Sequence, residues 1–257
     1  MNSSTLVATY DFRLVALSVV IAICASYVAL DLAGRVTAAR NSSRVAWLIG
    51  GAIAMGTGIW SMHYTGMLAY RLPIQVYYHV PTVLLSLVAA IAASFVALYV
   101  VSRPSISVLH VIVGSLLIAA GICGMHYTGM ASMRLAAMHQ WDAMLVSMSV
   151  AVALIVALAA LGLTYLFREE GGDNVLKGVC AIIMGFAVPA MHYTGMAAVS
   201  FKAMPDAPDM TNAIDISGVA NIAIIAVTFV VLGSVFVASR VFAPAHEPSA
   251  ASSAAKA

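Results

Sequence analysis

Charged side chains are scarce in this sequence. Asp, Glu, Lys and Arg make up 9% of the 257 residues, whereas hydrophobic residues make up 63%. A soluble globular domain carries about 25% charged residues, so the composition excludes that class. We predict an integral membrane protein. Its expected surroundings are a lipid bilayer, and no nucleic-acid partner is expected.

Cysteine and buried acidic residues are also few. The three cysteines, Cys24, Cys123 and Cys180, lie far apart and form no CxxC motif, which excludes a disulfide framework. Asp31 is the only acidic residue inside an expected span, which argues against ion-coupled transport. The last span has no lysine for a Schiff base, which argues against a retinal photosensor.

Long apolar stretches are abundant. Seven of them reach the roughly 20 residues that cross a bilayer core of about 30 Å, and a backbone in lipid must satisfy its own hydrogen bonds as helix. The expected spans are 13–33, 46–70, 82–102, 107–133, 143–167, 177–200 and 219–241. The predicted fold is all-α integral membrane. Residues 1–243 form the membrane domain, and the Ala/Ser-rich residues 244–257 form a disordered cytoplasmic tail.

The N-terminal segment before the first span lacks the basic residues of a cleaved signal peptide, so we expect the first helix to be retained. Eight Lys and Arg residues flank the spans on one side and four on the other. The positive-inside rule therefore predicts an N-terminus outside and a C-terminus in the cytoplasm.

One hexamer, Met-His-Tyr-Thr-Gly-Met, occurs three times, at 62–67, 125–130 and 191–196. Each copy lies near the end of an even-numbered span, and chance does not produce three identical hexamers in a chain of this length. The repeat extends beyond the hexamer, because residues 22–30 of the first span match 90–98 of the third. The sequence thus predicts three parallel helix pairs and a seventh helix. Parallel repetition of this kind can place three equivalent sites around one axis.

Within the hexamer the residues divide between faces of the helix. At about 100° per residue, His63 and Met67 project to one side, and Gly66 leaves a gap beside them. Met62 and Tyr64 flank the histidine. The glycines Gly66, Gly129 and Gly195 are therefore expected to be points of close approach for a helix, a ligand or an ion.

A histidine inside a membrane span indicates a functional site, because it is costly to bury there without a partner. Three histidines at the same depth predict a metal-binding site. Imidazole binds Cu, Zn, Fe and Ni, and thioethers select Cu(I). Copper is favoured over zinc because the motif offers no carboxylate or paired thiolate. The candidate ligands are His63, His126 and His192, with Met62, Met125, Met191, Met67, Met130 and Met196. Tyr64, Tyr127 and Tyr193 are candidates to hydrogen-bond a ligand of the metal or a group behind it.

Other interpretations remain open at this point. Duplication copies a packing motif as faithfully as a metal site, so the hexamers also suit plain helix packing. The same Met and His residues suit a copper transporter or chaperone, although such a protein needs ligands along the whole depth of the membrane. Paired histidines also suit a haem or redox protein, which is a weaker candidate. The sequence alone does not show that the three histidines converge.

The three motifs on alternate helices of a seven-span chain resemble the MHYT domain of bacterial membrane sensors, and the resemblance covers nearly the whole chain. It implies a bacterial cytoplasmic-membrane protein that senses O2, CO or NO through copper held near the outer face. Members are often fused to cytoplasmic diguanylate cyclase or cyclic-di-GMP phosphodiesterase domains. This sequence shows none, so we expect a non-enzymatic signal-transduction module that acts through a separate cytoplasmic or membrane partner.

Overall fold

The computed structural model describes residues 5–166, 168, 174–216 and 218–241. In these residues the chain forms seven helices: α1 (Phe12–Ala38), α2 (Asn41–Ala69), α3 (Val80–Val101), α4 (Val108–Ala131), α5 (Ala143–Leu166), α6 (Asn174–Ala197) and α7 (Val219–Val241). Each is long and apolar enough to cross a membrane. The predicted seven-span helical membrane fold is confirmed. The boundary at residue 243 and the predicted tail lie outside the described residues.

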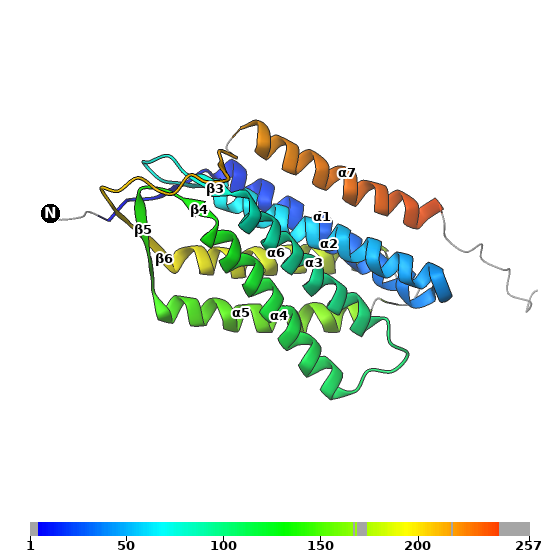
Figure 1. Ribbon diagram of the computed structural model, residues 1–257. Coiled ribbons are helices and arrows are strands. Elements are labelled where there is room, and N and C mark those ends of the chain that lie inside the picture. The colour runs from blue at the N-terminus through cyan, green and yellow to red at the C-terminus, as the bar shows by residue number, and fades with distance from the viewer. Residues whose placement is uncertain (1–4, 167, 169–173, 217, 242–257) are drawn as a thin grey trace, which may run out of the picture.

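Short strands, which the sequence did not predict, gather at one end of the helices (Figure 1). The strands are β1 (Thr9–Tyr10), β2 (Tyr70–Arg71), β3 (Tyr77–His79), β4 (Met133–Arg134), β5 (Ala137–Trp141), β6 (Val199–Ala203) and β7 (Ala213–Ile214). The sheets are antiparallel, with orders β1-β2, β4-β3-β7 and β5-β6. Strands β2, β4 and β6 directly follow the three helices that carry the hexamers, so we call this region the strand end.

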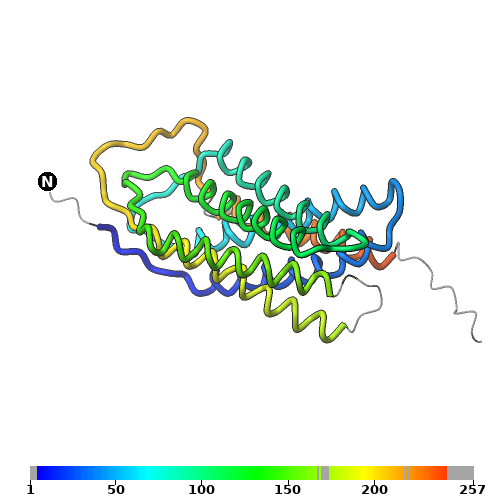
Figure 2. The backbone as a smooth tube through the Cα atoms, turned by 90° about the horizontal axis from the view of Figure 1, so that it is seen from below, coloured from blue at the N-terminus to red at the C-terminus, as the bar shows by residue number. Residues whose placement is uncertain are grey.

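Helices α1 to α6 form a closed ring. Each packs against the next in sequence, and α6 returns to α1. Across the ring α2 touches both α4 and α6, while α1 touches α3 and α5. Helix α7 lies outside the ring against α2 and α1, and runs away from the strand end (Figures 1 and 2). The three helix pairs thus surround one axis.

Small residues let the helices of the ring approach closely, and they do so in equivalent places. A Cβ on Gly58 of α2 would lie 2.6 Å from the Cβ of Ala25 in α1. A Cβ on Gly121 of α4 would lie 2.6 Å from that of Ala93 in α3. Ala25 and Ala93 occupy matching positions of the repeat seen in the sequence. That repeat therefore conserves a helix–helix contact that requires small side chains.

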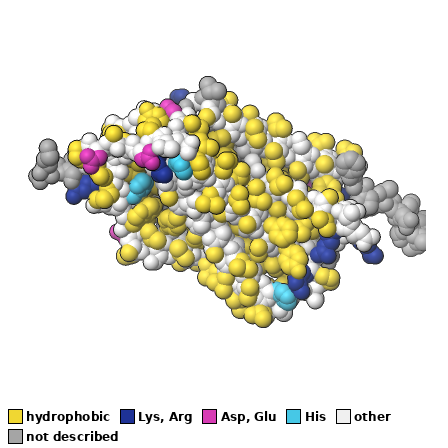
Figure 3. Space-filling model, in the orientation of Figure 1, with side chains coloured by type: hydrophobic (Ala, Val, Ile, Leu, Met, Phe, Trp, Pro, Cys, Tyr) yellow, Lys and Arg dark blue, Asp and Glu magenta, His cyan; other side chains and the backbone are white. Residues whose placement is uncertain are grey.

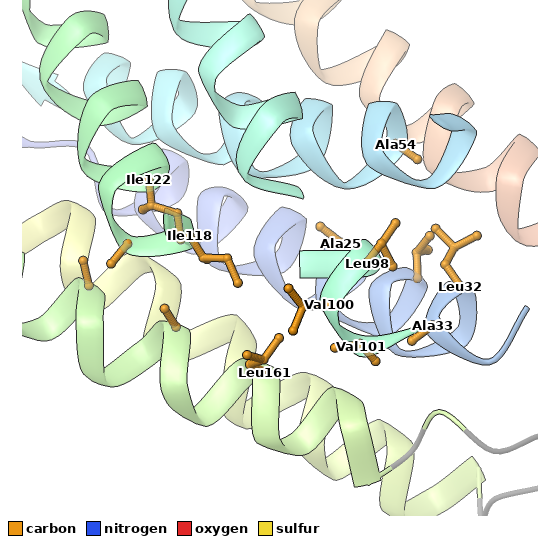
Figure 4. Close-up of a cluster of buried hydrophobic side chains, with 14 of the residues drawn as sticks. Ala25, Leu32, Ala33, Ala54, Leu98, Val100, Val101, Ile118, Ile122 and Leu161 are labelled. Carbon is orange, nitrogen blue, oxygen red and sulfur yellow. The ribbon is translucent and has the colours of Figure 1, made fainter. Parts of the chain in front are cut away.

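The surface has the polarity of a membrane protein. Hydrophobic side chains cover the middle of the molecule, and charged side chains gather towards its two ends (Figure 3). Large side chains such as Leu85, Val88 and Ile155 are 60–65% exposed on the outside of the ring. Inside, a buried cluster joins Ala25 and Leu32 of α1 with Leu98 of α3 and Ile118 of α4 (Figure 4).

A buried ion cluster fastens α7 to the ring. The Asp31 carboxylate of α1 lies 3.4 Å from Lys177 Nζ of α6 and 3.5 Å from Arg240 Nη2 of α7. The Ser239 hydroxyl of α7 donates to the other carboxylate oxygen at 2.6 Å. The Asp31 and Lys177 side chains are 6% and 11% exposed. Helix α1 and the last two helices, α6 and α7, therefore share one buried carboxylate.

Candidate metal centre

The three motif histidines meet on the axis of the ring. His63, His126 and His192 lie in the last two turns of α2, α4 and α6, next to the strand end. Each is 1% exposed. The helices bring them together because the parallel repeat gives all three the same depth and the same face. Among the described residues, they form the one group of three or more His, Cys, Asp or Glu side chains placed to hold an ion.

The rings converge through their Nδ1 atoms. The Nδ1–Nδ1 distances are 3.0 Å between His63 and His192, 3.2 Å between His126 and His63, and 3.3 Å between His192 and His126. The ring planes are steeply inclined to one another, at 74–87°. The site is a nearly equilateral triangle of nitrogen atoms, as expected of three copies around one axis.

The motif glycines fix which nitrogen faces the axis. A Cβ on Gly129 would lie 2.2 Å from His63 Nε2, and one on Gly195 would lie 2.3 Å from His126 Nε2. A Cβ on Gly66 would lie 2.3 Å from His192 Nε2. Each histidine thus seats its outer edge in the notch that the glycine of another hexamer leaves, in a closed cycle. Gly is required at these positions because any side chain would occupy the place of the ring.

This geometry suits a metal ion. A tetrahedral ion with bonds of about 2.0–2.1 Å to imidazole holds its nitrogen ligands about 3.3–3.4 Å apart, close to the observed triangle. Three neutral rings at this spacing direct lone pairs at one another unless protons or a cation lie between them. The three Nδ1 atoms face one another, whereas each Nε2 lies against the glycine of another hexamer, so Nδ1 is the atom that can reach an ion on the axis. Three ligands leave one coordination position open.

The motif tyrosines bind serines on neighbouring helices rather than the histidine nitrogens. Tyr64 lies 3.4 Å from Ser86 of α3, and Tyr127 lies 2.5 Å from Ser149 of α5. Tyr193 lies 2.9 Å from Ser18 of α1. Each tyrosine ring also contacts the edge or face of the adjacent histidine, with centroids 4.8–5.1 Å apart. The tyrosines therefore hold the motif helices to the other helices of the ring.

These serines were missed in the sequence, although signals for them were present. Ser86 and Ser149 both lie 22 residues after their tyrosine partners. Such a conserved spacing between copies of a repeat indicates an equivalent contact. Ser18 has a different signal in the repeat: it lies four residues before residue 22, as Ser86 lies four residues before residue 90. Its partner Tyr193 is 175 residues away, so the pair forms only when the ring closes.

The candidate methionines fall into two groups. Met67, Met130 and Met196, which follow each histidine by four residues, are at most 2% exposed and share one buried cluster with Tyr64 and Phe201. Of the methionines that precede the histidines, Met62 packs with Ile21 and Ala22 of α1 and Met191 with the cluster of Figure 4. Met125 lies in the same cluster as Met67, Met130 and Met196. The first group is gathered in one place and the second is dispersed.

The strand end covers the triad. Phe201 of β6 is fully buried and Tyr78 of β3 is 3% exposed, both in the same cluster as Met67 and Met130. Tyr10 of β1 stacks edge-on against Tyr193. Burial, followed by the nearby Tyr70 and Tyr193, raises the pKa of Tyr10 to about 12, so its hydroxyl is neutral at physiological pH. The buried side chains of this cover are aromatic and aliphatic, and one of its charged side chains, Arg71, lies exposed.

Comparison with known sequences places this arrangement in a family. The profile of the MHYT family, described as a bacterial signalling protein N-terminal repeat, matches residues 1–46, 56–114, 120–176 and 185–247. No solved structure matches the chain.

Curated relatives are larger signalling proteins. The chain is 44% identical over 197 residues to the bifunctional diguanylate cyclase/cyclic di-GMP phosphodiesterase MucR of Pseudomonas aeruginosa. It is 38% identical over 193 residues to the cyclic di-GMP phosphodiesterase NbdA of the same organism, and 35% over 196 residues to the signalling protein YkoW of Bacillus subtilis. The matches cover 74–76% of this chain but 24–29% of the relatives. The predicted family is confirmed: this chain belongs to the MHYT family of bacterial signalling proteins.

Proposed function

We propose that this protein is a copper-binding sensor module, in which the Nδ1 atoms of His63, His126 and His192 hold the ion. The observation that carries the proposal is their buried triangle of Nδ1 atoms, with sides of 3.0–3.3 Å. A nitrogen triad with thioethers nearby and no carboxylate or thiolate in the cluster suits copper. Copper in such a site offers an open position for O2, CO or NO, or a change of oxidation state.

Haem fits this cluster poorly. Two axial histidines must approach a flat macrocycle from opposite faces, whereas here three rings meet through nitrogens about 3 Å apart. A site for a single ion matches the spacing better. Met67, Met130 and Met196 are the more suitable thioethers for the same ion, because all three lie in one cluster, whereas Met62 and Met191 lie in two others.

For the output, we propose that a change at the triad moves α6 and is passed to α7. His192 and Lys177 lie on the same helix, and Lys177 shares the Asp31 carboxylate with Arg240 at the far end of α7. Tyr193 and Ser18 join α6 to α1 nearer the triad. Two curated relatives are named as enzymes that make or degrade cyclic di-GMP. We propose a partner of that kind. This module detects, and a separate cytoplasmic or membrane partner responds.

The proposed setting is the bacterial cytoplasmic membrane, with the N-terminus outside and the C-terminus in the cytoplasm. The strand end then faces outwards, and the triad lies just beneath it. This orientation rests on the distribution of Lys and Arg between the two ends. A gas or a redox change outside the cell would reach the site without crossing the full bilayer.

A copper-handling role is the second candidate, because two further thioethers lie along the axis. Met55 and Met184 line a cavity on the side of the triad away from the strand end. The equivalent position on α4 is Ile118, so this second layer has two sulfurs rather than three. Transport of copper through the ring would need ligands beyond that layer.

Binding of carbon monoxide distinguishes the gas-sensor role from the copper-handling role. We expect the purified, Cu(I)-loaded protein to bind about one CO per copper, seen as a single C–O stretching band by infrared spectroscopy. The triple variant His63→Ala, His126→Ala, His192→Ala is the control and should show no band. Tightly bound copper that gives no band with CO, and none with NO, would contradict the gas-sensor role and favour copper handling.

A further inference from the structure

A small cavity lies on the axis beneath the triad. Its volume is about 70 Å³, and residues of α1, α2, α4, α5 and α6 line it. Three of these residues, Ile59, Ile122 and Val188, each precede a motif histidine by four positions. Residues four apart lie on one face of a helix, with a rise of about 6 Å. The cavity is therefore one helical turn from the triad, on the same axis.

The α1 side of the cavity is made of small residues. Ala22, Ala25 and Ala29 follow helical spacing along one face of that helix and line the cavity. Bulkier residues from the other helices, among them Met55, Val156 and Met184, complete the wall. The short side chains of α1 leave this space open.

The lining disfavours water. Ser26 is the only side chain with a hydroxyl, amide or charge among the described residues that line the cavity. A buried water typically needs two to four polar partners, and apolar cavities remain dry. One hydroxyl does not meet that need. A dry cavity in a protein interior takes up small apolar molecules, as shown by a cavity of roughly 150 Å³ that binds benzene or xenon.

We propose that this axial cavity binds one small apolar molecule, of the size of xenon or a diatomic gas. At about 70 Å³ it is too small for a benzene-sized guest and large enough for a single diatomic. The site itself requires no metal. We assign it the role of holding a gas molecule one helical turn from the ion. That role rests on the proposed function.

Xenon tests the binding site directly. Crystals of the full chain, prepared without copper and pressurised with xenon, should show one anomalous peak between Ile59, Ile122 and Val188. Ala160→Leu fills the cavity from α5 and should remove the peak. Ala159→Leu makes the same change one residue away on the exposed face and should leave it. Met184→Ala enlarges the cavity and should raise the xenon occupancy.

The xenon experiment and the copper experiments can fail independently of each other. A peak that is lost only in Ala160→Leu supports the cavity even if the protein fails to bind copper, and then only the proposed role beside the ion is lost. Ordered water, a lipid chain or no density in the xenon-treated wild type would overturn the proposal, even if copper binds at the triad. If Ala160→Leu does not crystallise, an unchanged occupancy in Met184→Ala would also overturn it.

Discussion

Replacing Gly129 with alanine is expected to lower copper affinity about 100-fold, the upper end of the effect of losing a group that orients a metal ligand. The added methyl would lie 2.2 Å from His63 Nε2, so the ring must move by about 1 Å. A metal site tolerates a displacement of roughly 0.5 Å. His63 is 1% exposed, so the ring cannot move out to the surface. Competition with a Cu(I) chelator measures the effect.

Gly124→Ala is the matched control. It lies on the same helix, five residues earlier, and a Cβ there meets nothing within 4 Å. We expect wild-type copper affinity from this variant. If Gly129→Ala binds copper as tightly as Gly124→Ala while both remain folded, the rings are not held as the structure shows. Gly195→Ala and Gly66→Ala repeat the test at the other two corners of the triangle.

Replacing Asp31 with asparagine is expected to destabilise the protein by about 3 kcal/mol, the lower end of the range for breaking a buried ion pair. The change keeps the shape and an acceptor for Ser239, but it leaves Lys177 with its charge buried beside a neutral amide. For a chain of this size the unfolding midpoint should fall by about 6–12 °C. Thermal unfolding of the purified protein in detergent measures it.

Asp11→Asn provides the comparison. Asp11 pairs with Arg71 at the strand end at 3.3 Å, but the two side chains are 33% and 54% exposed. Exposed pairs contribute little because water screens them, so this variant should keep the wild-type midpoint. Equal midpoints for Asp31→Asn and wild type would show that the shared carboxylate does not fasten α7 to the ring.

The fold was predictable because the signals are local and repeated. Length and hydrophobicity define each span, and the span boundaries shifted by only a few residues. The hexamers also implied an equal depth for His63, His126 and His192. The match between residues 22–30 and 90–98 indicated helix pairs, and the contacts of Ala25 and Ala93 show that it marks a packing surface.

Contacts between helices that are distant in the chain could not be predicted from the sequence. Closure of α6 onto α1 creates the Tyr193–Ser18 pair and the partners of Asp31, and no local pattern encodes closure. The short strands lack the length and alternation that make a strand recognisable, since the longest has five residues. Which edge of each imidazole faces the axis depends on a glycine of another helix, so Nδ1 could not be chosen over Nε2 beforehand.

Copper content is the most direct test of the metal site. The purified, detergent-solubilised protein is compared with the variant His63→Ala, His126→Ala, His192→Ala, before and after loading with Cu(I). We predict close to one copper per chain in the wild type and none retained by the variant. Equal, negligible copper in both after loading would contradict the metal site and leave the histidine triad as a packing or proton-sharing cluster.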